Sequence, residues 1–169
     1  STQHAPQHRH TRIVITLDDG RDLRFLDQRT FGGLTLAPLV DGIPGPVTHI
    51  APDPFEECFD VDEVVRRLCA RRSAIKRSLL DQTLVSGIGN IYADETLWRV
   101  RCHPETPCSR LSQSEAVELL QTACDVMAEA MSQGGTSFDS LYVNVNGESG
   151  WFSRVLDAYG REDEPLPPM

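Results

Sequence analysis

The sequence has 169 residues, of which 40% are hydrophobic and 24% charged, and its formal net charge is −9. These proportions are those of a soluble globular protein, and the longest apolar runs are too short to cross a bilayer, so no membrane span is expected. The net charge argues against general nucleic-acid affinity, which comes largely from Lys and Arg that neutralise phosphates. The first residues lack the apolar stretch of a secretory signal, and a cytoplasmic location is therefore expected.

The amino-terminal part reads as a polar end followed by β structure. Ser1–His10 is expected to be disordered, and an unstructured end explains its histidines more simply than a metal site does. Arg12–Leu17 and Asp22–Leu26 flank Asp18-Asp19-Gly20, which predicts a β-hairpin. Leu34–Val40 is expected to add a third strand.

The predicted fold class is α+β. An incomplete antiparallel β piece is expected over residues 11–50, a helical domain over residues 51–161 and a tail over residues 162–169, with Asp41–Pro54 as the linker. About three strands cannot close a two-sheet sandwich, so they would leave an apolar face and unpaired edges. The β piece is therefore expected to pack on the helical domain, to pair with a second copy or a protein partner, or to be poorly ordered.

The first two predicted helices carry a basic run. One helix starts at a capping box of Asp60 and Glu63, and the next is expected to run from a cap at Ser73 to about Gln82. A solvated helical face is the commoner explanation of such a run, and a local DNA-binding surface is the alternative. The cations are Arg66, Arg67, Arg71, Arg72, Lys76 and Arg77.

Two further helices follow. Asn90 is expected to open a helix that runs to about Val100. Ser112 and Glu115 form a second capping box, and the long helix behind it keeps apolar residues at helical spacing until Gly134-Gly135 ends it. The sequence therefore predicts a helical domain with short connections.

The five cysteines indicate neither a disulfide framework nor a zinc cage, because their number is odd and no C-x-x-C pair is present. Reduced, mostly buried thiols are the simpler interpretation. The cysteines are Cys58, Cys69, Cys102, Cys108 and Cys124.

The turn Ser86–Asn90 is the strongest local candidate for a binding site. Its two glycines let the backbone approach a ligand closely and leave free amides at a helix start, which suits a phosphate. A simple connection between two packed helices is the alternative. Lys76 and Arg77 on the preceding helix favour the phosphate, because a cation and a helix amino terminus can then address the same DNA backbone.

Three other features each have two explanations. Arg29 and Phe31 can point the same way off an extended loop and wedge into a base stack, or Phe31 can fill a local core while Arg29 pairs with Asp27. The loop Thr136–Gly150 can be a lid over a flipped base or an ordinary surface loop. The adjacent Asp94-Glu95 pair is expected to be solvated or to cap a helix.

No self-sufficient active site is present in the sequence. It contains no G-x-S-x-G, no H-E-x-x-H, no Walker lysine loop and no paired Cys/His ligands. No catalytic residue and no metal ligand is therefore assigned.

Several of these motifs, taken together, match one known family in order and spacing. They are Ile75-Lys76, Asp81-Gln82, Val85–Glu95, Gly134–Thr136 and Tyr159–Arg161. In these segments the chain closely resembles the formamidopyrimidine-DNA glycosylase and endonuclease VIII family. Asp27–Gly33 and the hairpin resemble the end of that family's amino-terminal β-sandwich, so the likeness covers roughly residues 8–165. The resemblance implies a helix-two-turns-helix domain that grips DNA, a zinc finger after it, and an amino-terminal proline that attacks the sugar of an everted oxidised purine.

The resemblance also implies roles for individual residues. Lys76 and Asn90 would contact phosphates beside the lesion, while Arg29 and Phe31 would fill the gap left by the flipped base. The loop from Thr136 to Gly150 would cap the lesion, with Thr136 and Ser137 at its start. The remaining DNA-contact candidates are Gly89, Arg77, Tyr159 and Arg161.

Two family features have no counterpart in this sequence. The Pro-Glu start, which supplies nucleophile and acid/base, is not matched, and Leu166 stands near the position of the first zinc cysteine, so neither zinc nor another cofactor is expected. The leading interpretation is a family member that binds oxidised or abasic double-stranded DNA without glycosylase chemistry. The alternatives are part of an active DNA glycosylase and abasic-site lyase, or an acidic protein-interaction module that has lost DNA binding.

Overall fold

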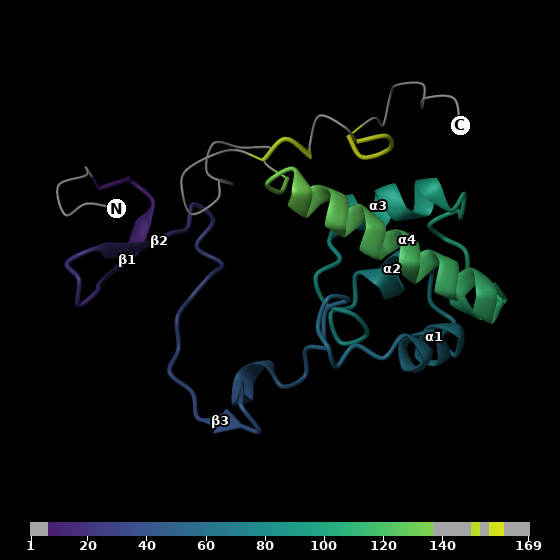
Figure 1. Ribbon diagram of the computed structural model, residues 1–169, viewed down its shortest axis with the longest axis horizontal. Helices are drawn as coiled ribbons and strands as arrows, with labels where there is room; N and C mark the ends of the chain where they lie inside the picture. The colour runs from purple at the N-terminus through teal and green to yellow at the C-terminus, as the bar shows by residue number, and fades with distance from the viewer. Residues whose placement is uncertain (1–6, 137–149, 153–155, 161–169) are drawn as a thin grey trace. The chain divides into compact units, whose positions relative to one another are not determined.

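The computed structural model describes residues 7–136, 150–152 and 156–160 (Figure 1). It divides into two compact units, residues 1–39 and residues 40–169. The division falls before residue 50, where the sequence analysis ended the β piece. Small antiparallel strand pairs and a set of α-helices make the fold α+β, as predicted.

The first unit contains the predicted hairpin. Strand β1 (Thr11–Thr16) pairs antiparallel with β2 (Asp22–Leu26), with Thr16 opposite Asp22. Gly20 has a φ of +79° and donates its amide to the Leu17 carbonyl at 2.9 Å. A glycine is suited to this left-handed position, so the local sequence fixes both the turn and the register.

The predicted third strand over Leu34–Val40 is wrong for most of its length. Strand β3 covers only Leu39–Val40, and it pairs with β4 (Ile43–Pro44) rather than with the first hairpin. Asp41 and Gly42, both at positive φ, form the two-residue connection between them. An Asp-Gly turn directly after Val40 favours this local pairing. A 3₁₀ helix, η1 (Gly45–Val47), follows, so the predicted linker contains short regular elements.

The second unit is built on a long helix, α4, which packs against α1 and α3 (Figure 1). A 3₁₀ turn, η2, precedes α4 and packs against α1. The bounds are α1 (Val61–Cys69), α2 (Ile75–Leu79), α3 (Asn90–Arg99), η2 (Cys108–Arg110) and α4 (Gln113–Ser132).

The predicted helix starts are confirmed for α1 and α4. The Asp60 carboxylate accepts the Glu63 amide at 3.0 Å, and Ser112 and Glu115 form a complete capping box. Helix α2 is shorter than predicted and has Ala74 at its N-cap, without a side-chain cap. The Ser73 hydroxyl is hydrogen-bonded to the buried Ser78 hydroxyl at 2.7 Å and is therefore not used as a cap.

The main core lies between α4 and the three shorter helices. Leu68, Ile75 and Leu79 are completely buried there. The expectation of mostly buried cysteines is wrong: Cys108 is buried in this core, but Cys58 is exposed and the others are half-buried. Within the described residues, every helix is too short or too polar to span a lipid bilayer.

A smaller cluster lies towards the carboxyl end of α4. Its buried members are Val126, Ala130, Phe152 and Leu156. Half-buried Ile91, Tyr92 and Tyr159 pack against it. Residues after α4 are thereby fixed to the first turn of α3.

Candidate nucleic-acid interface

The glycine turn between α2 and α3 is held from within by one side chain. The Gln82 amide nitrogen donates to the carbonyls of Leu80 (3.1 Å) and Ile88 (3.0 Å), and its oxygen accepts the Gly87 amide at 2.9 Å. Sequence reasoning gave Gln82 no role of its own. Its position a few residues before a glycine turn was the available signal, because an amide side chain can satisfy both donors and acceptors there.

The two glycines of the turn differ in what surrounds them. Gly87 has a φ of +86°, and a Cβ at this position would lie 2.9 Å from Cε of Met127. Gly89 has extended backbone, and a Cβ there would meet nothing within 4 Å. The left-handed backbone at 87 therefore favours glycine there, whereas the space beside Gly89 is open to a ligand.

Helix α3 begins at this open space. Gly89 is its N-cap and provides no side-chain cap, and Ala93 makes the first helical bond, to the Gly89 carbonyl at 2.9 Å. In the described part of the chain, the amides of Asn90, Ile91 and Tyr92 have no acceptor. Gly89 and Asn90 are both exposed. Unpaired amides at an exposed helix start can bind an anion such as a phosphate.

Lys76 lies beside this helix start. Its Nζ is 2.6 Å from Oδ1 of Asp94, and both side chains are about one-third exposed or less (31% and 26%). Asp94 is four residues after Asn90 and so shares its face of α3. The structure thus brings the Lys76 ammonium and the Asn90 face together, while Arg77 is exposed on α2. The expectation that Asp94 is solvated or capping is wrong, because it is paired with a cation.

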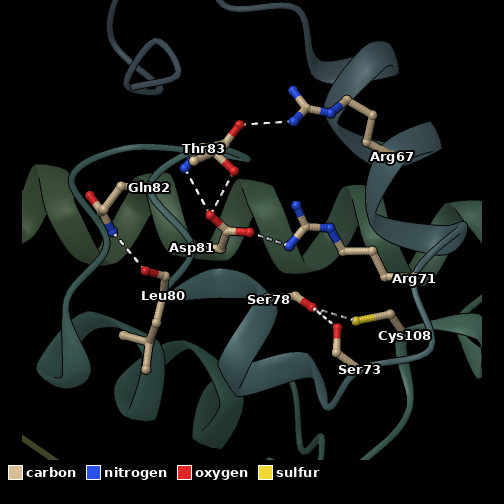
Figure 2. A network of polar contacts seen from close by, with 9 residues as sticks. All are labelled: Arg67, Arg71, Ser73, Ser78, Leu80, Asp81, Gln82, Thr83 and Cys108. Atoms are coloured by element: carbon tan, nitrogen blue, oxygen red, sulfur yellow. Dashed lines mark hydrogen bonds and ion pairs between the residues drawn. The ribbon is translucent and has the colours of Figure 1, made fainter. Parts of the chain in front are cut away.

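The basic run is only partly available to a ligand. Figure 2 shows Arg67 donating to the Thr83 carbonyl at 2.8 Å and Arg71 paired with Asp81 at 2.7 Å. Arg66 is paired with Glu63 on α1. These three cations therefore serve internal contacts, whereas Arg72 is exposed as Arg77 is.

Asp81 organises the connection between α2 and the glycine turn (Figure 2). Its carboxylate accepts the hydroxyl (2.7 Å) and the amide (2.9 Å) of Thr83 as well as the Arg71 guanidinium. The Thr83 hydrogen bonds and then Arg71 lower the pKa of Asp81 to about 2. This competing turn ends α2 before Gln82, where the sequence analysis had placed its end.

Glu95 is completely buried, which corrects the expectation that it is solvated or capping. Its carboxylate accepts the backbone amides of Asp157 (3.0 Å), Ala158 (2.8 Å) and Tyr159 (2.9 Å). The available signal was its spacing, because Glu95 is one helical turn after Ile91 and so lies on the same buried side of α3. Tyr159 is thereby placed against α3.

The residues on both sides of the loop 137–149 are also fixed. Trp151 donates its amide to the Gln133 carbonyl (3.0 Å) and Phe152 to the Gly135 carbonyl (3.3 Å). The Thr136 hydroxyl is 3.4 Å from the Tyr92 hydroxyl on α3. Thr136 therefore lies next to the first turn of α3. The other two predicted contacts in this part, Ser137 and Arg161, lie outside the described residues.

The Arg29 and Phe31 pair belongs to the first unit. Phe31 is 87% exposed, so the alternative in which it fills a local core is wrong. The Asp27 carboxylate accepts the amides of Gly32 (2.7 Å), Thr30 (2.8 Å) and Arg29 (3.0 Å), and it has no ion pair with Arg29. These backbone bonds lower the pKa of Asp27. The loop therefore presents an aromatic side chain to its surroundings.

A metal centre is not formed by the described residues. Among them, no three His, Cys, Asp or Glu side chains converge in a way that could hold a metal ion. The family resemblance implies zinc, but these residues do not fit such a site.

The chain is similar to proteins of one family in both sequence and structure. Residues 50–141 match the family described as "Formamidopyrimidine-DNA glycosylase H2TH domain". The formamidopyrimidine-DNA glycosylase of Mycolicibacterium vanbaalenii is 60% identical over 164 residues, which is 95% of this chain and 56% of that protein. The one of Rhodococcus jostii is 57% identical over 166 residues, 96% of this chain and 57% of that protein. The chain thus spans somewhat more than half the length of these relatives.

Solved structures agree with the sequence relatives. The MutM (Fpg) protein from Thermus thermophilus superposes with a TM-score of 0.80 at 34% identity, covering 96% of this chain and 61% of that one. The Lactococcus lactis Fpg in complex with DNA containing an abasic site gives a TM-score of 0.81 at 31% identity, covering 98% and 60%.

Proposed function

Because the chain belongs to the formamidopyrimidine-DNA glycosylase family, we propose that its helical unit binds double-stranded DNA at the start of α3. One observation carries the proposal: the unpaired amides of Asn90 and Ile91 lie at an exposed helix start beside the Lys76 ammonium. Amides and a cation in this arrangement suit two oxygens of a phosphate backbone. The preferred substrate is duplex that contains an oxidised base or an abasic site.

The interface contacts the phosphate backbone and does not read the base sequence. Gly89 leaves room for the backbone to approach, and Asn90 adds a side-chain donor at the same place. Local charge matters here, because the chain as a whole is acidic and repels DNA elsewhere. We assign outer backbone contacts to Arg77, Tyr159 and Arg161.

Two further sets of residues act at the lesion itself in this proposal. Arg29 and Phe31 fill the space left by an everted base, which is consistent with the exposed ring of Phe31. Thr136 and Ser137 begin the loop over the everted base. We place this activity in the cytoplasm, since the relatives named above are bacterial and their DNA lies there.

The proposal is tested by fluorescence-anisotropy titration of a duplex that contains an abasic-site analogue. We expect Lys76→Ala and Asn90→Ala each to weaken binding about tenfold. For Lys76→Ala, the slope of log K against log salt concentration should also fall by about one. Unchanged affinity in both variants would sink the proposal.

Two controls keep the titration interpretable. Lys76→Ala leaves Asp94 without its cation and so adds a repulsive charge, which the double variant Lys76→Ala/Asp94→Asn removes. A loss that persists in the double variant is due to the missing ammonium. Arg110→Ala, which removes an exposed cation at the end of η2, should change the affinity less than twofold.

A second candidate function is favoured by the relatives, which carry the name formamidopyrimidine-DNA glycosylase at 57–60% identity. In this alternative the chain is part of an active glycosylase and abasic-site lyase, whereas the leading proposal gives it the binding step alone. Borohydride trapping on oxidised-purine duplex separates the two. A covalent protein–DNA adduct requires an amine nucleophile and supports catalysis, and binding without an adduct supports the leading proposal.

A further inference from the structure

The carboxylate of Glu95 is the most deeply buried charged group in the described residues, and the DNA-binding proposal does not use it. The residue is 0% exposed, and its two oxygens accept three consecutive amides, those of Asp157, Ala158 and Tyr159, at 2.8–3.0 Å. No Lys or Arg of the described residues forms an ion pair with it. Within the part of the chain that the structure describes, backbone amides are therefore the groups that balance its charge.

Such an arrangement is costly unless all its partners stay in place. A buried carboxylate loses its hydration, and each hydrogen bond to the charged oxygen must compensate for that loss. If the segment 157–159 moved away, one charge and three amides would lose their partners together. Glu95 therefore specifies one position of this segment.

That position is next to the proposed phosphate site. Leu156 is buried in the small cluster with Phe152, and Tyr159 packs against the same cluster as Ile91 and Tyr92. Ile91 and Tyr92 directly follow Asn90 in the first turn of α3. Helix α3 thus carries three parts of the interface. Its first turn provides the free amides, its Asp94 holds Lys76 by an ion pair, and its Glu95 holds the segment 157–159 by hydrogen bonds.

From this geometry we infer that Glu95 is a positioning residue, which fixes residues 156–160 against α3 so that Tyr159 and the α3 amides form one continuous DNA-contact surface. The part of the inference that concerns DNA rests on the proposed function. The part that concerns the segment is independent of it. Two experiments address the parts separately.

The first experiment measures amide hydrogen exchange in the full chain without DNA. Glu95→Gln keeps the side-chain volume but replaces one acceptor oxygen by an NH₂ group. This donor then faces a backbone N–H, so that hydrogen bond is lost. We expect exchange at Asp157, Ala158 and Tyr159 to accelerate about tenfold or more, with α1 and α4 unchanged. Glu118→Gln, the same change at an exposed site on α4, should leave exchange unaffected. Equal protection in Glu95→Gln and the parent chain would overturn the inference.

A second variant covers the case in which Glu95→Gln does not fold. Leu156→Ala removes the apolar contact of the segment and leaves α3 intact. If the Glu95 carboxylate is the anchor, the three amides should stay protected in a folded Leu156→Ala chain. Loss of their protection in that chain would show that the apolar contact holds the segment and would overturn the inference.

The second experiment is a double-mutant cycle on affinity for the duplex with the abasic-site analogue. We expect Glu95→Gln to weaken binding about fivefold alone, by the same factor in a Lys76→Ala background, and less than twofold in a Tyr159→Ala background. A general structural defect would lower the affinity equally in both backgrounds and would overturn the positioning role. If the parent chain does not bind any duplex, the proposed function fails, and the exchange experiment still decides whether Glu95 holds the segment.

Discussion

The two units of the chain differ in the contacts that stabilise each of them internally. In the helical unit, side chains from α1 to α4 are buried in one core, and those of Phe152 and Leu156 are buried against the end of α4. In residues 7–39, no hydrophobic side chain is fully buried. The exposed large hydrophobic residues of that unit are Val14, Ile15, Leu17, Leu23, Leu26, Phe31, Leu34, Leu36 and Leu39. A local turn signal is thus sufficient to pair two strands, but it does not create a core.

An aspartate organises a turn in each unit. The turn in the first unit uses local contacts only, whereas the turn in the helical unit also uses a distant one. All the amides that Asp27 accepts lie within five residues of it. Asp81 accepts from neighbouring Thr83 but also from Arg71, which lies in the connection between α1 and α2, ten residues earlier in the chain. The first turn depends on local contacts alone, whereas the second also depends on a contact between the two ends of α2.

The largest expected effect tests whether stability is confined to the helical core. Leu68→Ala removes a completely buried side chain of α1 and should lower the free energy of unfolding by about 3 kcal/mol. Leu36→Ala, at a fully exposed position, should change it by less than about 0.5 kcal/mol. Urea denaturation followed by far-ultraviolet circular dichroism, which reports helix content, measures both. Similar losses in the two variants would contradict the comparison.

A smaller effect on the free energy of unfolding is expected when Asp81, which has a distant partner in Arg71, is replaced. The pKa of Asp81 is about 2 in the folded chain and lies below its ordinary value of 3.8, so its ionised form stabilises the fold at neutral pH. This contribution is lost as the pH falls from about 4 to about 2. Asp81→Asn should therefore cost about 1 kcal/mol at pH 7, a value reduced for the partial exposure of the side chain, and almost nothing at pH 2.

The measurement for Asp81 is urea denaturation at a series of pH values. Asp125→Asn, at an exposed position of α4, is the matched control and should show neither the loss nor its pH dependence. A constant difference between the Asp81→Asn and parent chains from pH 7 to pH 2 would mean that the carboxylate charge is not the cause.

The smallest effect concerns a strained residue at the end of α3. Arg101 has a φ of +54°, and the following amide, of Cys102, bonds back to the Leu97 carbonyl at 2.9 Å, as in a glycine-terminated helix. Arg101→Gly should raise the free energy of unfolding by about 0.5 kcal/mol. Arg101→Ala keeps the strain and removes the guanidinium, so the difference between the two variants isolates the backbone. A less stable glycine variant would show that the arginine side chain compensates for its strain.

Elements with a local signal were predictable from the sequence. The Asp-Gly turn of the hairpin, the caps at Asp60 and Ser112, and the glycine turn before Asn90 all lie where the sequence placed them. The predicted strand does not form over Leu34–Pro38. The Asp41-Gly42 turn lets β3 pair with β4, so the alternating apolar residues before β3 have no strand partner. Local patterns predict an element only where its partner is also local.

The parts of the candidate site that were missed depend on distant partners. Glu95 and Asp94 are adjacent and chemically alike, yet one is buried against amides 62 to 64 residues away and the other is paired with Lys76 on a different helix. Arg67 and Arg71 look like DNA contacts in the sequence, but they bind the Thr83 carbonyl and Asp81. Charge type alone does not distinguish an internal partner from an exposed one.

The unequal surroundings of the two glycines in the turn also bear on how this interface can change in evolution. A side chain at 87 needs an unfavourable φ and displaces the end of the Met127 side chain, so substitutions there lower the stability of the fold. A side chain at 89 meets empty space and fits an ordinary φ, so substitutions there act mainly on ligand binding. Folding and recognition therefore impose separate selection pressures on positions only two residues apart, and recognition can be altered at 89 while the helix pair stays intact.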